Sequence, residues 1–139
     1  MALNSKEERT LVLIKPDAIE RGLIGEVISR FEKKGLAIIA LEMMQMTPEI
    51  ADMHYKEHLN KPFYPALKEF MTSGPIIAMI LEGRDVIHIV RKMAGATDAA
   101  TAEPGSIRGD FSTSNKQNIV HASDSSESAT REITLFFGV

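Results

Sequence analysis

The chain has 139 residues, of which 44% are hydrophobic and 25% are charged, which is the ordinary composition of one globular domain with a single core. Its formal net charge of −3 argues against nonspecific binding to nucleic acid or membranes, so any anion-binding site must be local. There is no cysteine, which excludes disulfides and thiolate metal sites and fits a reducing compartment.

The N-terminus lacks the apolar core of a signal peptide, and the longest apolar runs in the chain are only of strand length. We therefore expect a cytoplasmic protein without a membrane-spanning segment. Because no linker interrupts the sequence, we expect a single domain over residues 1–139.

Residues 10–14 form a continuous apolar run that predicts a strand. The run ends at Lys15-Pro16-Asp17, because proline removes a backbone donor and stops strand pairing. A lysine at a strand end is often only a solvated end residue, but a phosphate-binding site needs such a point charge. The residues alone leave both interpretations of Lys15 open.

Apolar spacing and turn residues define the middle of the chain. Gly35 is a natural helix stop, and Thr47 with Pro48 supplies the cap and first residue of another helix. A Gly-Pro break then precedes an apolar run of the length expected for a buried central strand. The predicted helices span residues 23–34, 47–59, 62–72 and 86–94, and the predicted strands span residues 36–46 and 76–81.

His54 and His58 lie four residues apart on one predicted helix and could in principle share a metal ion. The zinc-protease pattern requires glutamate directly after the first histidine, and Tyr55 stands there. Polar residues on an exposed helix face are therefore the better account of both.

Residues 96–118 show no periodicity and are rich in Gly, Ser, Thr, Asp, Pro and Asn. A long irregular stretch inside a compact domain is usually functional or disordered. With Lys15 and Arg91, its Arg108 makes a scattered set of cations that suggests a phosphate ligand. No Gly-x-x-x-x-Gly-Lys-Ser/Thr motif occurs, so the usual backbone phosphate cradle is missing.

In residues 118–124, a short β-branched run places His121 just before a final helix, whose first turn contains Glu127 and which runs to Phe137. Ser123, Asp124 and Ser125 are candidate caps for that helix. Glu132 can fold back on His121 and fix its tautomer, which makes the histidine a candidate nucleophile. A satisfied, partly buried histidine is the alternative reading of His121 alone.

Together these motifs closely resemble a nucleoside diphosphate kinase from about residue 9 to 137. The match rests on Lys15-Pro16-Asp17, Ser73-Gly74-Pro75, residues 106–111 and residues 118–124, in the family's order and spacing. The resemblance implies an α/β (α+β) fold, a ferredoxin-like sandwich whose four-stranded antiparallel sheet carries helices and a long irregular loop.

The resemblance also implies the activity, which is transfer of the terminal phosphate of a nucleoside triphosphate to a nucleoside diphosphate through a phosphohistidine in a ping-pong mechanism. The implied substrates are nucleotides such as ATP, GTP, ADP and GDP, with neither nucleic acid nor membrane required. Mg²⁺ is expected to be held mainly through the nucleotide phosphates, since no carboxylate cluster forms a dedicated cage. A homo-oligomer, tetramer or hexamer, built from dimers is implied as well.

Carried over by position, His121 looks like the phosphorylated residue and Glu132 like the acid that orients it, with Ser123 and Lys15 beside them. Cations at such a site offset the charge that spreads over the transferred phosphoryl group, and an aromatic side chain stacks on any base. The implied nucleotide contacts are Lys15, Tyr55, Phe63, Leu67, Arg91, Thr97, Arg108 and Asn118, with Phe63 and Leu67 forming the base platform.

The chain departs from the family pattern at four places. Ala122 replaces a usual glycine after the histidine, which we expect to leave activity intact. Asn115 replaces an apolar residue opposite the stacking aromatic, which we expect to lower nucleotide affinity. Ala99 replaces a common proline in the long loop, and the chain ends at Val139 without a C-terminal extension, so we expect comparatively weak higher-order assembly.

The alternative function is a non-catalytic nucleotide-binding or scaffolding module on the same fold, since fold alone does not determine function. Such a module would be expected to have lost His121 or Glu132. Both are present, which favours the enzyme.

Overall fold

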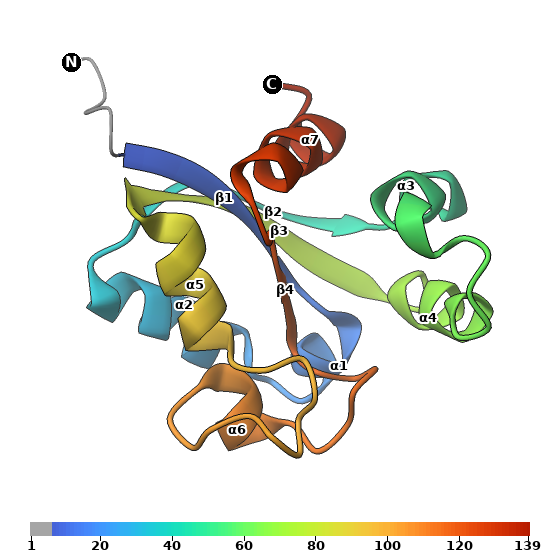
Figure 1. Ribbon diagram of the computed structural model, residues 1–139, viewed down its shortest axis with the longest axis horizontal. Helices are drawn as coiled ribbons and strands as arrows, with labels where there is room; N and C mark the ends of the chain where they lie inside the picture. The colour runs from blue at the N-terminus through green and yellow to red at the C-terminus, as the bar shows by residue number, and fades with distance from the viewer. Residues whose placement is uncertain (1–6) are drawn as a thin grey trace.

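The computed structural model describes residues 7–139 as one antiparallel sheet flanked by helices (Figure 1). The strands are β1 (Glu7–Ile14), β2 (Ala37–Gln45), β3 (Pro75–Arg84) and β4 (Val120–Ala122), in the sheet order β2-β3-β1-β4. The helices are α1 (Pro16–Glu20), α2 (Ile24–Lys34), α3 (Pro48–His54), the 3₁₀ turn η1 (Lys56–His58), α4 (Tyr64–Met71), α5 (Val86–Ala94), α6 (Ile107–Phe111) and α7 (Ser126–Phe137). The four-stranded antiparallel sheet predicted from the resemblance is confirmed.

At β1 both faces of the sheet are covered, because alternate residues of this strand enter two different core clusters. Val12 and Ile14 pack with residues of α2 and α5 on one face. Leu11 and Leu13 pack with residues of α3, α4 and α7 on the other. Burial on both sides explains why the strand reads as a continuous apolar run instead of an alternating one.

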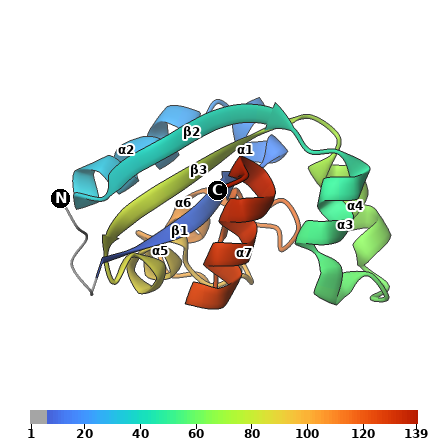
Figure 2. The same ribbon diagram turned by 90° about the horizontal axis from the view of Figure 1, so that it is seen from above.

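Helices α3 and α4 lie side by side at the end of the sheet where β2 finishes and β3 begins (Figures 1 and 2). The predicted helix over 47–59 is shorter than expected: Thr47 caps it by accepting the Ile50 N–H, but regular α-helix stops at His54 and continues only as η1. The helix predicted from residue 62 begins at Tyr64. Boundaries of this kind depend on tertiary packing more than on local propensity.

Two short helices were not predicted. Pro16 both ends strand pairing and occupies the first turn of α1, a position where its missing N–H costs nothing. Residues 96–118, expected to be wholly irregular, contain α6, which Ser106 caps by accepting the Gly109 N–H. A Cβ at Gly109 would lie 1.9 Å from the Glu103 carbonyl oxygen, so only glycine fits this tight approach.

Within residues 7–139, no helix has both the length and the apolar character that a bilayer crossing requires.

Candidate active site

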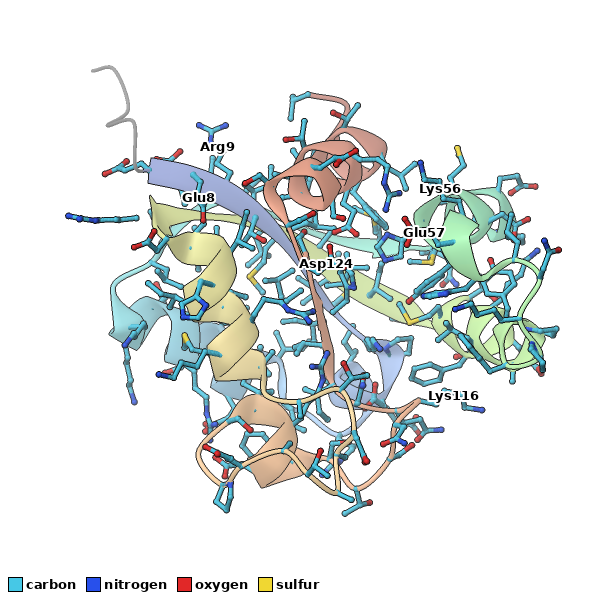
Figure 3. The ribbon with its side chains drawn as sticks, in the orientation of Figure 1. Glu8, Arg9, Lys56, Glu57, Lys116 and Asp124 are labelled. Atoms are coloured by element: carbon cyan, nitrogen blue, oxygen red, sulfur yellow. The ribbon has the colours of Figure 1, made fainter. Side chains whose placement is uncertain are left out.

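A cavity of about 610 Å³ lies where β4, α5, η1, α4 and the long loop meet, and we call it the central cavity. Figure 3 labels two of its lining residues, Lys116 from the loop and Asp124 from the β4–α7 connection. Ten predicted site residues, separated by up to 117 positions in sequence, line this cavity, and the buried Ser123 hydrogen-bonds to one of them, Glu132. The ten are Lys15, Tyr55, Phe63, Leu67, Arg91, Thr97, Arg108, Asn118, His121 and Glu132.

His121 is held by a short chain of hydrogen bonds. Its Nε2 lies 2.9 Å from Glu132 Oε1, and the Ser123 hydroxyl donates to the same carboxylate oxygen at 2.6 Å. Burial raises the pKa of Glu132, but the hydrogen bond and charge of His121, with the Ser123 hydroxyl, outweigh it and lower the pKa below its ordinary value. An ionised carboxylate accepts only, so Nε2 carries a proton, and in the neutral imidazole Nδ1 then keeps its lone pair.

The backbone just before His121 is strained. Ile119 has a φ of 77°, and the Val120 N–H donates to the Asn118 carbonyl at 2.8 Å, which is the pattern of a rare γ-turn. The buried Asp17 carboxylate accepts the Ile119 N–H at 3.2 Å, while the Lys15 N–H donates to the Ile119 carbonyl at 2.8 Å. Strain of this kind persists only when the surroundings hold it, and it is concentrated at functional sites.

Lys15 is buried, so the interpretation that it is only a solvated residue at a strand end is wrong. The interpretation that it supplies a positive charge to a binding site remains. Its Nζ donates to Asn118 Oδ1 at 2.7 Å. Burial first, and then the charge of Arg108, lower the pKa of Lys15 to about 8, although Asp17 opposes the shift. An anion that enters the cavity would therefore stabilise the charged form of this lysine.

Arg108 is equally buried and binds three backbone carbonyls. It donates to Gly95 O and Val120 O at 2.7 Å each and to Asn118 O at 3.3 Å. Burial, followed by the charge of Arg91, lowers the pKa of Arg108 to about 10. Two guanidinium groups and an ammonium therefore converge with little acidic compensation, which is the electrostatic requirement of a polyphosphate site.

The opposite end of the central cavity is apolar and open. Phe63 is 50% exposed and shares the lining with Leu67 and Ala66. An exposed aromatic face beside aliphatic groups suits a planar ligand that stacks without being enclosed.

The chain matches the family model described as nucleoside diphosphate kinase over residues 8–139. The chain belongs to the nucleoside diphosphate kinase family. It is 64% identical over 130 residues to the nucleoside diphosphate kinase of Staphylothermus marinus, covering 94% of this chain and 92% of the relative. It is 58% identical to that of Rhodopirellula baltica, covering 94% and 86%.

Solved structures agree. The nucleoside diphosphate kinase of Halobacterium salinarum, solved in complex with CDP, superposes with a TM-score of 0.93 at 46% identity and covers 96% of this chain and 89% of its own. That of Aquifex aeolicus gives 0.91 at 46% identity. The family, the ferredoxin-like fold and the phosphotransferase activity predicted from the sequence are therefore confirmed, and the non-catalytic alternative is not favoured.

One departure from the family pattern gains an explanation. The side-chain oxygen of Asn115 accepts the Ala99 N–H at 3.1 Å, so two atypical residues of the long loop bind each other. A proline at position 99 would have no N–H to donate. The hydrogen bond from Ala99 to the Asn115 side chain therefore restores part of the rigidity that a proline at position 99 would give the loop.

Two residues of the nucleoside diphosphate kinase site were missed by sequence reasoning. His54, expected on an exposed polar face, is buried, and its ring meets that of His121 at a centroid distance of 4.6 Å. Burial, followed by the charge of His121, lowers the pKa of His54 well below its usual value. The available signal was its spacing of three from Ala51, the other buried residue of α3. Asp17 was seen only as part of a strand stop.

Proposed function

We propose that His121 Nδ1 is the nucleophile of this kinase and that the reaction proceeds by two transfers. In the first, Nδ1 attacks the γ-phosphorus, the bond to the bridging oxygen breaks, and the nucleoside diphosphate leaves. In the second, a terminal oxygen of another diphosphate attacks the phosphohistidine and regenerates the imidazole. The observation that carries the proposal is the Ser123–Glu132–His121 chain of hydrogen bonds, which engages Nε2 and so leaves Nδ1 as the free nitrogen of the neutral imidazole.

The cations are assigned to the transferring phosphoryl group. Lys15, Arg91 and Arg108 line the central cavity with His121, and their charges would offset the charge that develops on the equatorial oxygens. Thr97 and Asn118 are assigned to ribose and phosphate contacts. Tyr55 joins them, because its hydroxyl oxygen is buried without a hydrogen-bond partner among the described residues and lines the same cavity.

Mg²⁺ is proposed as the metal that accompanies the nucleotide. The cavity lining contains only two carboxylates within residues 7–139: Glu132 is engaged with His121 and Ser123, and Asp124 is exposed. This donor set does not make an all-protein cage, which fits a hydrated ion held mainly by phosphate oxygens. The bound ion would supply further charge neutralisation on the phosphates.

A homo-oligomer built from dimers is proposed from the exposed face of β2. Ile39, Leu41 and Met43 alternate along this edge strand and are 42%, 46% and 54% exposed. An apolar row on an open sheet edge is a pairing surface unless it is covered, and a symmetric second copy covers it with the same residues. Such a dimer is compatible with either a tetramer or a hexamer, and the weakness of the higher-order contacts stays a prediction. The cytoplasmic location of the protein also stays a prediction.

The function is tested by labelling with γ-³²P-ATP followed by a chase with GDP. We expect one acid-labile, alkali-stable phosphate per subunit, its transfer to GDP, and parallel initial-rate plots against the two substrates. His121→Ala should lose both label and turnover. Intersecting plots together with full activity of His121→Ala would refute the covalent route.

A further inference from the structure

A second, smaller cavity of about 120 Å³ adjoins His121, and we call it the His54 cavity. His121 and Glu132 line both cavities. Glu57 and Asp124, labelled in Figure 3, also line the His54 cavity, so its lining has three carboxylates against one guanidinium, that of Arg131. The balance of charge favours a cation over an anion at this position.

His54 is the residue that the phosphate chemistry leaves unexplained. It is 5% exposed, and neither of its ring nitrogens finds a hydrogen-bond partner anywhere in residues 7–139. Buried imidazole nitrogens normally have partners, since a neutral ring carries one donor and one acceptor. The unpaired nitrogens face a cluster in which His54, His121 and Glu132 each offer a ligand atom, all within 4.8 Å of one another.

Two imidazoles and one carboxylate are a donor set of three-ligand zinc sites that keep a fourth position open. With metal–ligand bonds of about 2.1 Å, neighbouring ligand atoms of a tetrahedral site stand roughly 3.4 Å apart. His121 Nε2 and Glu132 Oε1 are already 2.9 Å apart, so closure requires only a small separation of that pair and an approach by His54. Mg²⁺ prefers six oxygen ligands and is a poor fit.

We propose that His54, His121 and Glu132 form an inhibitory binding site for a zinc-like divalent cation. Binding would displace the Nε2 proton of His121, replace the Glu132 hydrogen bond, and draw electron density from the ring. Nδ1 would then be a poorer nucleophile toward the γ-phosphate. The inhibition rests on the proposed role of His121 as nucleophile, whereas the metal site itself does not.

The site is tested first by binding, on nucleotide-free protein without a histidine tag. Calorimetry with Zn²⁺ should show one ion per subunit in wild type and in His88→Gln, a control at an exposed histidine on α5. His54→Gln should bind at least tenfold more weakly. Co²⁺ should give the intense visible absorption of a four-coordinate site in wild type and lose it in His54→Gln.

Inhibition is then measured as phosphohistidine formation from γ-³²P-ATP at saturating Mg²⁺ and buffered free Zn²⁺. The inhibition midpoint should rise at least tenfold in His54→Gln and stay unchanged in His88→Gln. Because His54 packs against Phe136 and Tyr55, His54→Phe preserves an aromatic ring without a ligand atom and repeats the test if glutamine disturbs folding.

Equal zinc binding in wild type and both His54 variants would overturn the proposal. Binding that depends on His54 but leaves phosphorylation unaffected would overturn it too. If labelling instead shows a nucleophile other than His121, the mechanism fails while calorimetry and the Co²⁺ spectrum still decide whether the metal site exists.

Discussion

The two ends of the central cavity are built differently. At the end next to His121, Lys15, Arg108 and Glu132 are each at most 7% exposed and hydrogen-bond to backbone or side-chain partners. At the other end, Phe63 is half exposed. Under the proposed mechanism, the buried polar interactions lie where charge would develop and the base would meet a single open surface, which predicts strict geometry for phosphate and tolerance for the base.

Replacing Glu132 should have the largest effect of the variants that keep the nucleophile. Glu132→Gln keeps the shape but removes the charge that selects the His121 tautomer, so we expect turnover to fall by about 10²- to 10⁴-fold. Stopped-flow measurement of His121 phosphorylation checks this. Ser123→Ala leaves the carboxylate in place and should lower turnover less than Glu132→Gln does. Equal losses of turnover would contradict the order Ser123–Glu132–His121 assigned to the hydrogen bonds.

Substitutions at Lys15 and Arg108 should differ in whether they lower turnover alone or both turnover and melting temperature. Lys15→Met should lower turnover by about 10²-fold or more, with little change in melting temperature, because the buried ammonium is itself costly to fold. Arg108→Ala leaves three backbone carbonyls unpaired, so it should also lower the melting temperature by roughly 6–10 °C. Parallel calorimetry and kinetics of both variants distinguish the cases, and an Arg108→Ala protein as stable as wild type would refute the structural part.

The pH dependence should report Lys15. Its pKa of about 8 predicts that kcat/KM falls as pH rises above 8, because the free enzyme loses the ammonium. Between pH 8 and 10.5 the unfolded chain binds the lysine proton more tightly than the folded one, so this group makes folding more favourable as pH rises. Unfolding caused by Lys15 therefore cannot explain the fall. Lys15→Arg retains its charge and should show no fall near pH 8; an identical profile would point to another group.

Phe63→Ala tests the open end. Losing one stacking surface should weaken nucleotide binding by about 1–3 kcal/mol, roughly 5- to 150-fold in KM, for purines and pyrimidines alike. Turnover and melting temperature should change little. Phe63→Tyr is the control that keeps the aromatic face, and a loss confined to one base would show that Phe63 reads base identity.

The Asn115–Ala99 hydrogen bond should give the smallest effect. Asn115→Ala should make the ordered conformation of the loop about 0.5–1.5 kcal/mol less stable, which would be seen as a severalfold rise in KM. Ala99→Pro removes the donor, so adding Asn115→Ala in that background should cost nothing further. Fully additive effects in this double-mutant cycle would mean that the two side chains act independently.

Much of the site could be predicted because its residues stand in short local motifs. His121, Lys15 and Arg108 each follow or lie within a recognisable turn, strand end or loop, and those signals survive without the fold. His54 could not be found this way, because its burial depends on α7 and on the ring of His121 packing against it. Its neighbours in sequence give only a helical spacing that is equally compatible with an exposed face.

By itself the sequence determined the order of the strands and of the helices other than α1 and α6, the histidine–glutamate pair and the set of cations, because periodicity, caps and motif spacing are local properties of the chain. Only the tertiary structure decided that Lys15 is buried, that Ile119 is held in a strained turn by Asp17, that Arg108 binds three carbonyls and that Asn115 binds Ala99. These are contacts across 10 to 102 residues, and the charge, strain and pKa that they confer exist only once the sheet has closed around them.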